Sequence, residues 1–408
     1  MELTDPIHGR IDLSGWPEAL VQTRAFARLG GIRQQGNTFR VTPMANHDRF
    51  SHSVGAYAVM AKLVDHFTEI TPHLFSDTER IVALTAALLH DVGHGPFSHC
   101  FEGVTEIHHE EWSVRIIEED PEMRGILDRV PNLGADVTSV LQRLGRFPLL
   151  ESLLSSALGA DKLDYHSRDL FHSPLDLPAV DLDGLISGLA FTGTRMAVAE
   201  DRIPEIRKLL AIRTRQCSEI FAHPRVVAYD QVLAMVCRRA RWLHQHQGLM
   251  YTPRELAGLL DPTVRWTVGE YEELSDALMT ASIHRWADEP DPTLRRLAQR
   301  FVDDSLAAPC QWVAIPADAP RHDFERCLDP WNATLYRADP KYGKYSGGIW
   351  VQTASGVHDL TAVAPELRDD TDLAPAFLYY VEETPDIRRS LQLLRSSANS
   401  LAATSPTP

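Results

Sequence analysis

The sequence has few cysteines, no thiolate metal motif and no long apolar segment, and each absence excludes a class of protein. Its five cysteines are scattered, odd in number and never spaced as Cys-x-x-Cys, which argues against a disulfide framework and a thiolate zinc site. No apolar run approaches the ~20 residues that span a bilayer. The first residues lack the basic and apolar regions of a secretion signal. We therefore expect a reduced, cytoplasmic protein that does not enter a membrane.

Clustered positive charge is also missing. Lysine and arginine total 40 against 56 aspartates and glutamates, which gives a formal net charge of −16. Non-specific binding to nucleic acid needs clustered basic side chains, so we do not expect it here. Any site for a phosphorylated ligand must therefore be a local basic pocket in an acidic chain. The 408 residues, 44% hydrophobic and 24% charged, suit one large globular domain or two ordinary ones.

Most of the chain has the apolar periodicity of helices. A Ser-x-x-Glu capping box at 76–79 begins a helix whose apolar residues recur at helical spacing to Leu89. Helix is expected again over 203–245 and on to about 307, after a small β-excursion over 186–198. Strands are predicted over 312–315, 333–336, 349–351 and 377–381, with a short helix from Pro385.

The predicted fold class is therefore mainly α. We expect a helical core over 1–310, with the functional site within 1–240, and a smaller C-terminal α+β region over 311–395. The tail over 396–408 is rich in Ser, Thr, Ala and Pro and is expected to be disordered.

The segment from Leu88 to His99 concentrates polar side chains at the end of the capped helix. His90, Asp91, His94 and His99 fall within ten residues, in and before a Gly/Pro-rich turn. The His-Asp dipeptide occurs four times in the chain, but only His90-Asp91 follows a buried-looking helix. A solvated helix end is the alternative interpretation, but polar groups beside core residues need partners.

Two further residues, His52 and Asp161, stand on helical patterns and would complete a site of two imidazoles and two carboxylates. This ligand set suits Mn, Fe, Co, Ni or Zn better than Ca. Lys162, Tyr165 and Asp169 then follow at i, i+3 and i+7, which places them on one helical face. Taken alone, each histidine is more simply a core or surface residue, so the interpretation depends on the combined spacing.

These motifs resemble the HD-domain metal-dependent phosphohydrolases, in particular the deoxynucleoside-triphosphate triphosphohydrolase-like branch. The resemblance covers about residues 1–240, and its central segment is long and specific. The matching segments are Asp5–Gly9, Arg49–Ser53, Leu89–His99, His109-Glu110 and Asp161–Tyr165.

The resemblance implies a mainly helical HD-domain bundle that hydrolyses a dNTP to deoxynucleoside and triphosphate, with one divalent metal ion (Mn, Fe, Co, Ni, Zn or Mg) as cofactor. The implied metal ligands are His52, His90, Asp91 and Asp161. The implied catalytic histidines, beside the reacting phosphate, are His94, His99 and His109. The implied substrate-binding residues are Gln34, Arg49, Lys162, Tyr165, Asp169 and Arg213. Arg49, Lys162 and Arg213 would contact phosphate oxygens, and Tyr165 and Asp169 would face the sugar. The family often forms dimers or tetramers, so we expect a homo-oligomer.

The chain departs from the family pattern at several positions. Ser51 stands where Glu is common, Glu102 where Asp is common, and Phe221 where Tyr is common. The residues at positions used by activated relatives to read guanine are Gln22, Ala27 and Gly30, so activation there is not expected. Two alternatives stay open at this stage. One is an HD phosphatase acting on nucleoside monophosphates or other small phosphate esters, and the other is a nucleotide-sensing protein with weak turnover.

Overall fold

The computed structural model describes residues 1–246, 248–303, 308–315, 328–337, 345–368, 376–392 and 394. Backbone contacts divide the chain into two compact units. The first comprises Met1–Ile220, Trp266–Asp276 and Gly343–Asp370, and the second contains the described residues of 221–265, 277–342 and 371–408. No helix in the described part of the chain is long and apolar enough to cross a membrane.

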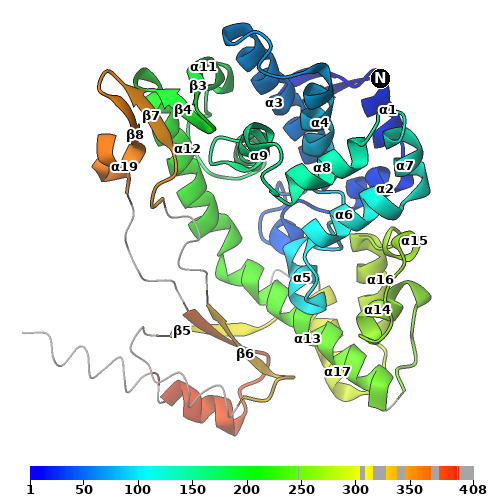
Figure 1. The fold of residues 1–408 in the computed structure, drawn as a ribbon. Helices are drawn as coiled ribbons and strands as arrows, with labels where there is room; N and C mark the ends of the chain where they lie inside the picture. The colour runs from blue at the N-terminus through cyan, green and yellow to red at the C-terminus, as the bar shows by residue number, and fades with distance from the viewer. Residues whose placement is uncertain are drawn as a thin grey trace, which may run out of the picture. The chain divides into compact units, whose positions relative to one another are not determined.

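The first unit is mainly helical (Figure 1). Its helices are α1 (Trp16–Val21), α2 (Arg24–Ala27), α3 (Arg49–Ile70), α4 (Asp77–Leu89), α5 (His99–Thr105), α6 (His109–Glu119), α7 (Pro121–Leu127), α8 (Leu133–Leu141), α9 (Pro148–Ser155), α10 (Ala160–Phe171), α11 (Leu182–Ser187), α12 (Ile203–Arg215), α15 (Val268–Tyr271) and α19 (Leu360–Val363). Helix α3 packs against both α4 and α10, and the residues of the predicted metal site lie on α3, on α10 and directly after α4.

Local sequence explains where these helices begin. The Asp48 side chain caps α3 by accepting a hydrogen bond of 2.8 Å from the Ser51 amide. The predicted capping box of α4 is confirmed, with both reciprocal bonds between Ser76 and Glu79 present. The apolar faces then bury side chains such as Leu63, Phe67 and Leu88 completely. Full burial of each such side chain stabilises the fold by about 1.5–3 kcal/mol.

Two small sheets belong to the same unit. Strands β1 (Glu2–Asp5) and β2 (Gly9–Asp12) form an antiparallel hairpin that the sequence analysis did not predict. The second sheet has the order β3-β4-β7-β8, with bounds Leu189–Thr192, Arg195–Ala199, Trp350–Thr353 and Gly356–Asp359. The predicted β-excursion over 186–198 is thus a hairpin, although Ile186 lies in α11. Its turn contains Gly193 with φ 62°, a backbone conformation that favours glycine.

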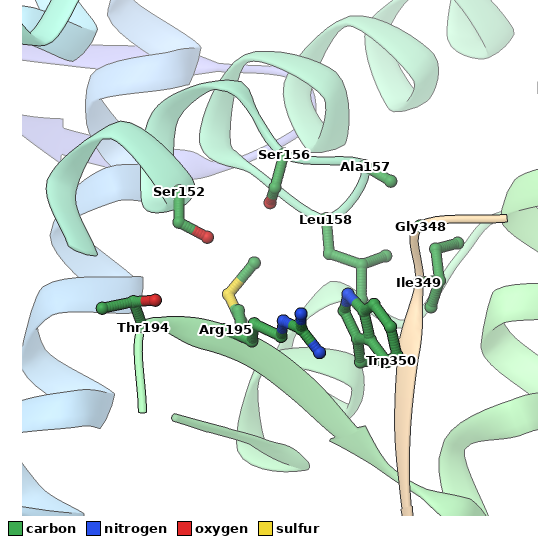
Figure 2. Close-up of a pocket in the computed structure, with 10 residues that line it drawn as sticks. Ser152, Ser156, Ala157, Leu158, Thr194, Arg195, Gly348, Ile349 and Trp350 are labelled. Carbon is green, nitrogen blue, oxygen red and sulfur yellow. The ribbon is translucent and has the colours of Figure 1, made fainter. Parts of the chain in front are cut away.

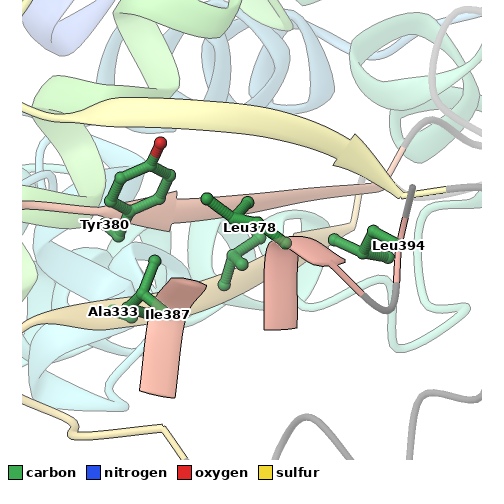
Figure 3. Close-up of a cluster of buried hydrophobic side chains, with 6 residues drawn as sticks. Ala333, Leu378, Tyr380, Ile387 and Leu394 are labelled. Atoms are coloured by element: carbon green, nitrogen blue, oxygen red, sulfur yellow. The ribbon is translucent and has the colours of Figure 1, made fainter. Parts of the chain in front are cut away.

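The second unit combines helices with a three-stranded sheet. Its helices are α13 (Pro224–His246), α14 (Ala257–Leu260), α16 (Asp276–Trp286, whose first residue falls in the first unit), α17 (Pro292–Val302) and a helix over 385–392. Its sheet has the order β5-β9-β6, with bounds Gln311–Ile315, Ala376–Tyr380 and Ala333–Arg337. Figure 3 shows the apolar cluster between sheet and helix, which includes Leu378, Tyr380, Ile387 and Leu394.

The predicted fold class, mainly α with small sheets toward the C-terminus, is confirmed, and all four predicted C-terminal strands are present within a residue or two. The boundary between the two compact units does not fall at residue 310 of the sequence. Strand β7 pairs in parallel with β4 of the first unit, whereas β5, β6 and β9 form a sheet of their own. Local periodicity cannot predict pairing with a parallel strand that lies about 150 residues away in the sequence. The predicted disordered tail over 396–408 lies outside the described residues.

Candidate metal centre and active site

Four predicted ligands converge where α3, α4 and α10 meet. His52 lies on the first turn of α3, His90 and Asp91 follow the last residue of α4, and Asp161 lies at the start of α10. The Nε2 atoms of His52 and His90 are 3.1 Å apart. Asp161 Oδ1 lies 3.4 Å from His52 Nε2 and 3.6 Å from His90 Nε2. Asp91 Oδ2 lies 3.5 Å from His52 Nε2, and Asp91 Oδ1 lies 3.4 Å from His90 Nε2.

These spacings fit a shared divalent cation. Metal–ligand bonds of about 2.0–2.2 Å at angles between octahedral and tetrahedral values put neighbouring donor atoms about 2.8–3.6 Å apart. The other ring nitrogen of each histidine has a hydrogen-bond acceptor, since His90 Nδ1 donates to Ala87 O at 2.9 Å and His52 Nδ1 to Asp164 Oδ2 at 2.7 Å. In the neutral rings both Nε2 atoms therefore present lone pairs to each other, an arrangement that a cation between them stabilises.

The carboxylates give this site a strong affinity for positive charge. Burial by itself would lower the pKa of His52, but Asp161 and Asp164 raise it to about 10. Burial also opposes the charged form of Asp161, yet hydrogen bonds from His52 and His90 hold the pKa of that carboxyl below its ordinary value. Protons and a metal ion would compete for the same donor atoms, because imidazole binds metal only when its nitrogen is deprotonated.

His52 is oriented by residues to which the sequence analysis gave no role. Asp164, fully buried, accepts from His52, from His8 Nε2 at 2.6 Å and from Arg168 at 2.9 Å. Arg168 also donates to Asp5 Oδ2 at 2.8 Å. Asp164 and the turn from Asp5 to Gly9 both lie in segments that resemble the family. That resemblance is the sequence signal from which their role could have been predicted. Ser51 does not support His52, because its hydroxyl donates to Asp48 O. The support comes from α10 instead.

A glycine on α3 permits this close approach of α10. A Cβ atom at Gly55 would collide with the carboxylate of Asp164 and the guanidinium of Arg168. The two helices therefore approach closely at the point where the buried charges meet. A side chain at position 55 would force the helices apart and separate His52 from Asp164.

The three predicted catalytic histidines form a second cluster around Glu102. His109 Nδ1 lies 2.6 Å from Glu102 Oε1, and the Nδ1 atoms of His99 and His94 lie 3.3 and 3.7 Å from the same oxygen. The rings of His94 and His109 stack at 3.8 Å. His94 also links the clusters, since its Nε2 lies 3.4 Å from Asp91 Oδ1. The His99 side chain is 69% exposed, so its ring is open to a ligand.

The environments of these groups set their charges. Partial burial of Glu102 acts to raise its pKa, but hydrogen bonds from His109 and His99 hold it below its ordinary value. Burial lowers the pKa of His94 well below its usual range, and the positive charges of Arg49 and His109 act in the same direction. We expect Glu102 to be ionised and His94 to be neutral at pH 7.

The turn before His99 has an unusual backbone. Phe97 and Ser98 have φ values of 56° and 54°, a left-handed conformation that non-glycine residues rarely adopt. Buried contacts hold the turn in place. The Phe97 amide donates to Asp276 Oδ1 at 2.7 Å, and the Ser98 hydroxyl donates to Arg33 O at 2.7 Å. Such strain persists only where the surrounding structure supports it, and here it directs His99 toward Glu102.

Arg49 is buried and makes three polar contacts through its guanidinium. It forms an ion pair with Asp91, its Nε donates to Ser98 Oγ at 2.9 Å, and a further nitrogen donates to Gln34 O at 3.1 Å. Within the described part of the chain, by contrast, the buried Gln34 side-chain oxygen has no hydrogen-bond partner, and neither does either amide atom of the neighbouring Gln35. Buried polar atoms without partners are rare in folded proteins.

The remaining predicted substrate residues lie along α10 and α12. Lys162 Nζ donates to Ser155 O at 3.0 Å, and the Tyr165 ring centroid lies 6.5 Å from that of His52. Asp169 is buried against His47, with 2.6 Å between Oδ1 and Nε2, a contact the sequence analysis missed. Burial raises the pKa of Tyr165, and the charges of Asp161, Arg213 and Asp169 all act on that hydroxyl, so these groups are neighbours. No carboxylate of the described residues forms an ion pair with Arg213.

Comparisons with known proteins agree with this geometry. The HD domain family matches residues 49–153, which include His52, His90 and Asp91. YwfO of Bacillus subtilis is 30% identical over 308 residues, or 74% of this chain and 70% of that protein. SAMHD1 of Danio rerio, named a deoxynucleoside triphosphate triphosphohydrolase, is 32% identical over 205 residues. That match spans 41% of this chain but only 33% of the Danio protein.

Solved structures share the fold over nearly the whole chain. A phosphohydrolase from Bacteroides thetaiotaomicron has a TM-score of 0.78 at 22% identity, covering 94% of this chain and 100% of that one. A protein from Aquifex aeolicus has a TM-score of 0.75 at 20% identity, covering 98% and 99%. The family match, the YwfO relative and the convergent His/Asp quartet lead to one conclusion. This chain belongs to the HD-domain phosphohydrolases, in the branch similar to the deoxynucleoside triphosphate triphosphohydrolases.

Proposed function

We propose that this phosphohydrolase cleaves dNTPs to deoxynucleoside and triphosphate. The observation that carries the proposal is the metal quartet lying directly beside the cluster of His94, His99, His109 and Glu102, with His94 in contact with both. In the reaction, water adds its oxygen to the α-phosphorus and gives up a proton, the bond from phosphorus to the 5′-oxygen breaks, and that oxygen takes a proton. The site therefore needs ligands for a divalent ion, a proton donor and cations for the triphosphate.

The chain offers a group for each task. His52, His90, Asp91 and Asp161 would hold a divalent ion, which supplies Lewis-acid polarisation of a phosphoryl oxygen and lowers the pKa of water. His99, the most exposed of the three histidines, protonates the leaving 5′-oxygen. His94 and His109 contact phosphate oxygens. Glu102 positions His99 and His109 by accepting from their Nδ1 atoms, which leaves each Nε2 for the substrate.

The substrate would lie between α10 and α12 in this proposal. Lys162 and Arg213 offset the negative charge of the triphosphate, and such cations act most strongly where water is excluded. Tyr165 and Asp169 face the sugar, with His47 holding one oxygen of that carboxylate in place. Arg49 positions Asp91, and its remaining N–H groups are donors for a phosphate oxygen.

One experiment separates this reaction from its alternatives. The metal-loaded protein is incubated with each dNTP, with ribonucleotides and with nucleoside monophosphates, and the products are resolved by ion-exchange chromatography. Tripolyphosphate from dNTPs is the expected product. Orthophosphate from monophosphates would instead identify a phosphatase, and saturable binding without product would identify a nucleotide sensor. A His90→Ala variant run in parallel excludes a contaminating hydrolase.

Replacing Glu102 with glutamine is expected to lower kcat about 10–100-fold while changing KM less than threefold. The size of the effect is that of other residues that orient a functional side chain. Glutamine keeps the shape of the side chain but loses the charge that two histidines share. Glu102→Asp keeps the carboxylate and should recover part of the rate. A glutamine variant as fast as the wild type would contradict the positioning role.

Replacing His358 with alanine is expected to leave turnover within twofold and stability within about 0.5 kcal/mol. This histidine belongs to one of the other His-Asp dipeptides, but it is exposed on β8 and contacts only Ser355 Oγ at 3.0 Å among the hydrogen-bond partners described. Steady-state kinetics and thermal denaturation check both values. Loss of activity in a stable variant would place chemistry outside residues 1–240. The other late dipeptide, His322-Asp323, lies outside the described residues.

A further inference from the structure

A pocket lies in the first unit, apart from the residues assigned to catalysis. Its volume is about 140 Å³, and Figure 2 shows it between the end of α9, the β3–β4 hairpin and the start of β7. The residues that line it are Ser152, Ser156, Ala157, Leu158, Thr194, Arg195, Met196, Gly348, Ile349 and Trp350. None of them is a metal ligand, a catalytic histidine or a substrate residue of the proposed reaction.

The charge of this pocket is opposite to that of the chain. The net charge of the protein is −16, yet among the described residues no carboxylate lines the pocket, whereas Arg195 does. The guanidinium of Arg195 stacks 4.4 Å from the centroid of the Trp350 ring, which orients its planar face and leaves its N–H edge for a ligand. No carboxylate of the described residues forms an ion pair with this arginine.

Hydroxyl groups complete a set of donors. The Ser156 Oγ atom is buried and has no hydrogen-bond partner among the described residues. Figure 2 shows the hydroxyls of Ser152 and Ser156 on the side of the pocket that faces Arg195 and Trp350. A hydroxyl that is buried without a partner carries an uncompensated desolvation cost, and a hydrogen bond to a ligand oxygen would offset that cost. A cation with neighbouring hydroxyl donors is the arrangement that binds phosphoryl oxygens.

The size of the pocket limits the ligand. Sites that enclose a whole small molecule usually have volumes of about 300–1,000 Å³. At about 140 Å³ this pocket accommodates a tetrahedral oxyanion with its first waters, but it does not enclose a nucleoside triphosphate. We propose that it binds a phosphoryl group, either as free phosphate or as the terminal group of a larger molecule that extends into solvent.

The pocket is joined to the metal centre by a short, tight turn. Residues 156–159 connect it to α10, which begins at Ala160 and carries Asp161. The Gly159 amide donates to Ser156 O at 3.0 Å, and a Cβ atom at Gly159 would collide with Leu154 O. An oxyanion on Ser156 therefore contacts the same turn that positions Asp161.

Calorimetric titration of the metal-free protein with orthophosphate tests the site without depending on the proposed reaction. Arg195→Gln is expected to weaken binding at least tenfold, because Arg195 is the only cation among the described residues that line the pocket. Ser156→Ala should weaken binding about threefold without lowering Tm, because its hydroxyl makes no hydrogen bond to the described residues that the change would remove. Arg10→Gln is the matched control, since Arg10 is an exposed arginine of the same unit whose guanidinium pairs with Glu2. Equal affinity of the wild type and Arg195→Gln would overturn the proposal.

Two further experiments locate the bound anion and identify the molecule from which it comes. Crystals soaked in tungstate should show an anomalous peak between Arg195 and Ser156, whereas a peak only at the histidine cluster would overturn the assignment. Titrations with tripolyphosphate and with deoxyadenosine monophosphate then compare the sources. Tighter binding of the nucleotide identifies the terminal group of a larger molecule as the ligand, and equal or weaker binding identifies the free ion.

Discussion

Replacing His90 or Asp161 with alanine is expected to remove the bound divalent ion and to lower turnover at least about a thousand-fold. Each variant loses one of four converging donor atoms. Lewis-acid stabilisation by an active-site ion is worth several kcal/mol, and 1.36 kcal/mol corresponds to tenfold in rate. Both variants should fold, because neither side chain neutralises a buried arginine. Metal content by mass spectrometry and tripolyphosphate release, measured on the same samples, check the prediction.

Asp91→Ala is expected to lose the ion as well, but with a further loss of stability. Asp91 pairs with Arg49, and the side chains of both are 5% exposed. Removing one partner of a buried ion pair costs about 3–5 kcal/mol, because the other charge stays buried without compensation. The three variants therefore separate metal binding from folding. Asp65→Ala is the control, since this carboxylate lies on the same helix as His52 but pairs with Arg80 at the surface. A full complement of tightly bound ion in His90→Ala and Asp161→Ala would contradict the ligand assignment.

Replacing His99 with alanine is expected to lower kcat about 10²–10⁴-fold while the metal is retained, which is the usual contribution of general acid catalysis. The 5′-oxygen of a dNTP leaves poorly without a proton. His99 is exposed beyond the strained turn at Phe97 and Ser98, and Glu102 holds its Nδ1 at 3.3 Å. A nitrophenyl phosphodiester, whose leaving group needs no proton, should lose much less. An equal loss on both substrates would mean that His99 does something other than protonate the leaving group.

The structure provides a matched control for His99. His108 is also exposed, at 75%, and its Nδ1 lies 3.6 Å from the other oxygen of Glu102. It precedes α6 and does not belong to the cluster that His94, His99 and His109 form with Glu102. His108→Ala should therefore keep kcat within twofold on both substrates. A large effect of His108→Ala would show that exposed histidines near Glu102 act through its charge rather than by proton transfer.

The helical elements could be predicted because their signals are local. The capping box at Ser76 and the apolar spacing to Leu89 lie within one helix, and both are found as expected. The strand at 349–351 was also predicted, but its neighbour was not, because pairing with β4 depends on residues far away in the chain. The hairpin of β1 and β2 was not predicted, because each strand has only four residues and gives a weak local pattern. The turn at Asp5–Gly9 between them gives a stronger local pattern than either strand.

The sequence by itself determined the helical class of this protein and pointed to the four converging side chains that we propose as metal ligands, because cap residues, apolar period and motif spacing are read over a few turns of chain. Only the tertiary structure decided how these residues are held. His8 and Asp164 are 156 positions apart and His47 and Asp169 are 122 apart, yet both pairs are in contact. The ion pair between Arg49 and Asp91, the shared contacts of Glu102 and the donors around Arg195 arise in the same way. Burial removes water from polar groups, each must then find a partner in space, and local spacing does not encode where that partner lies.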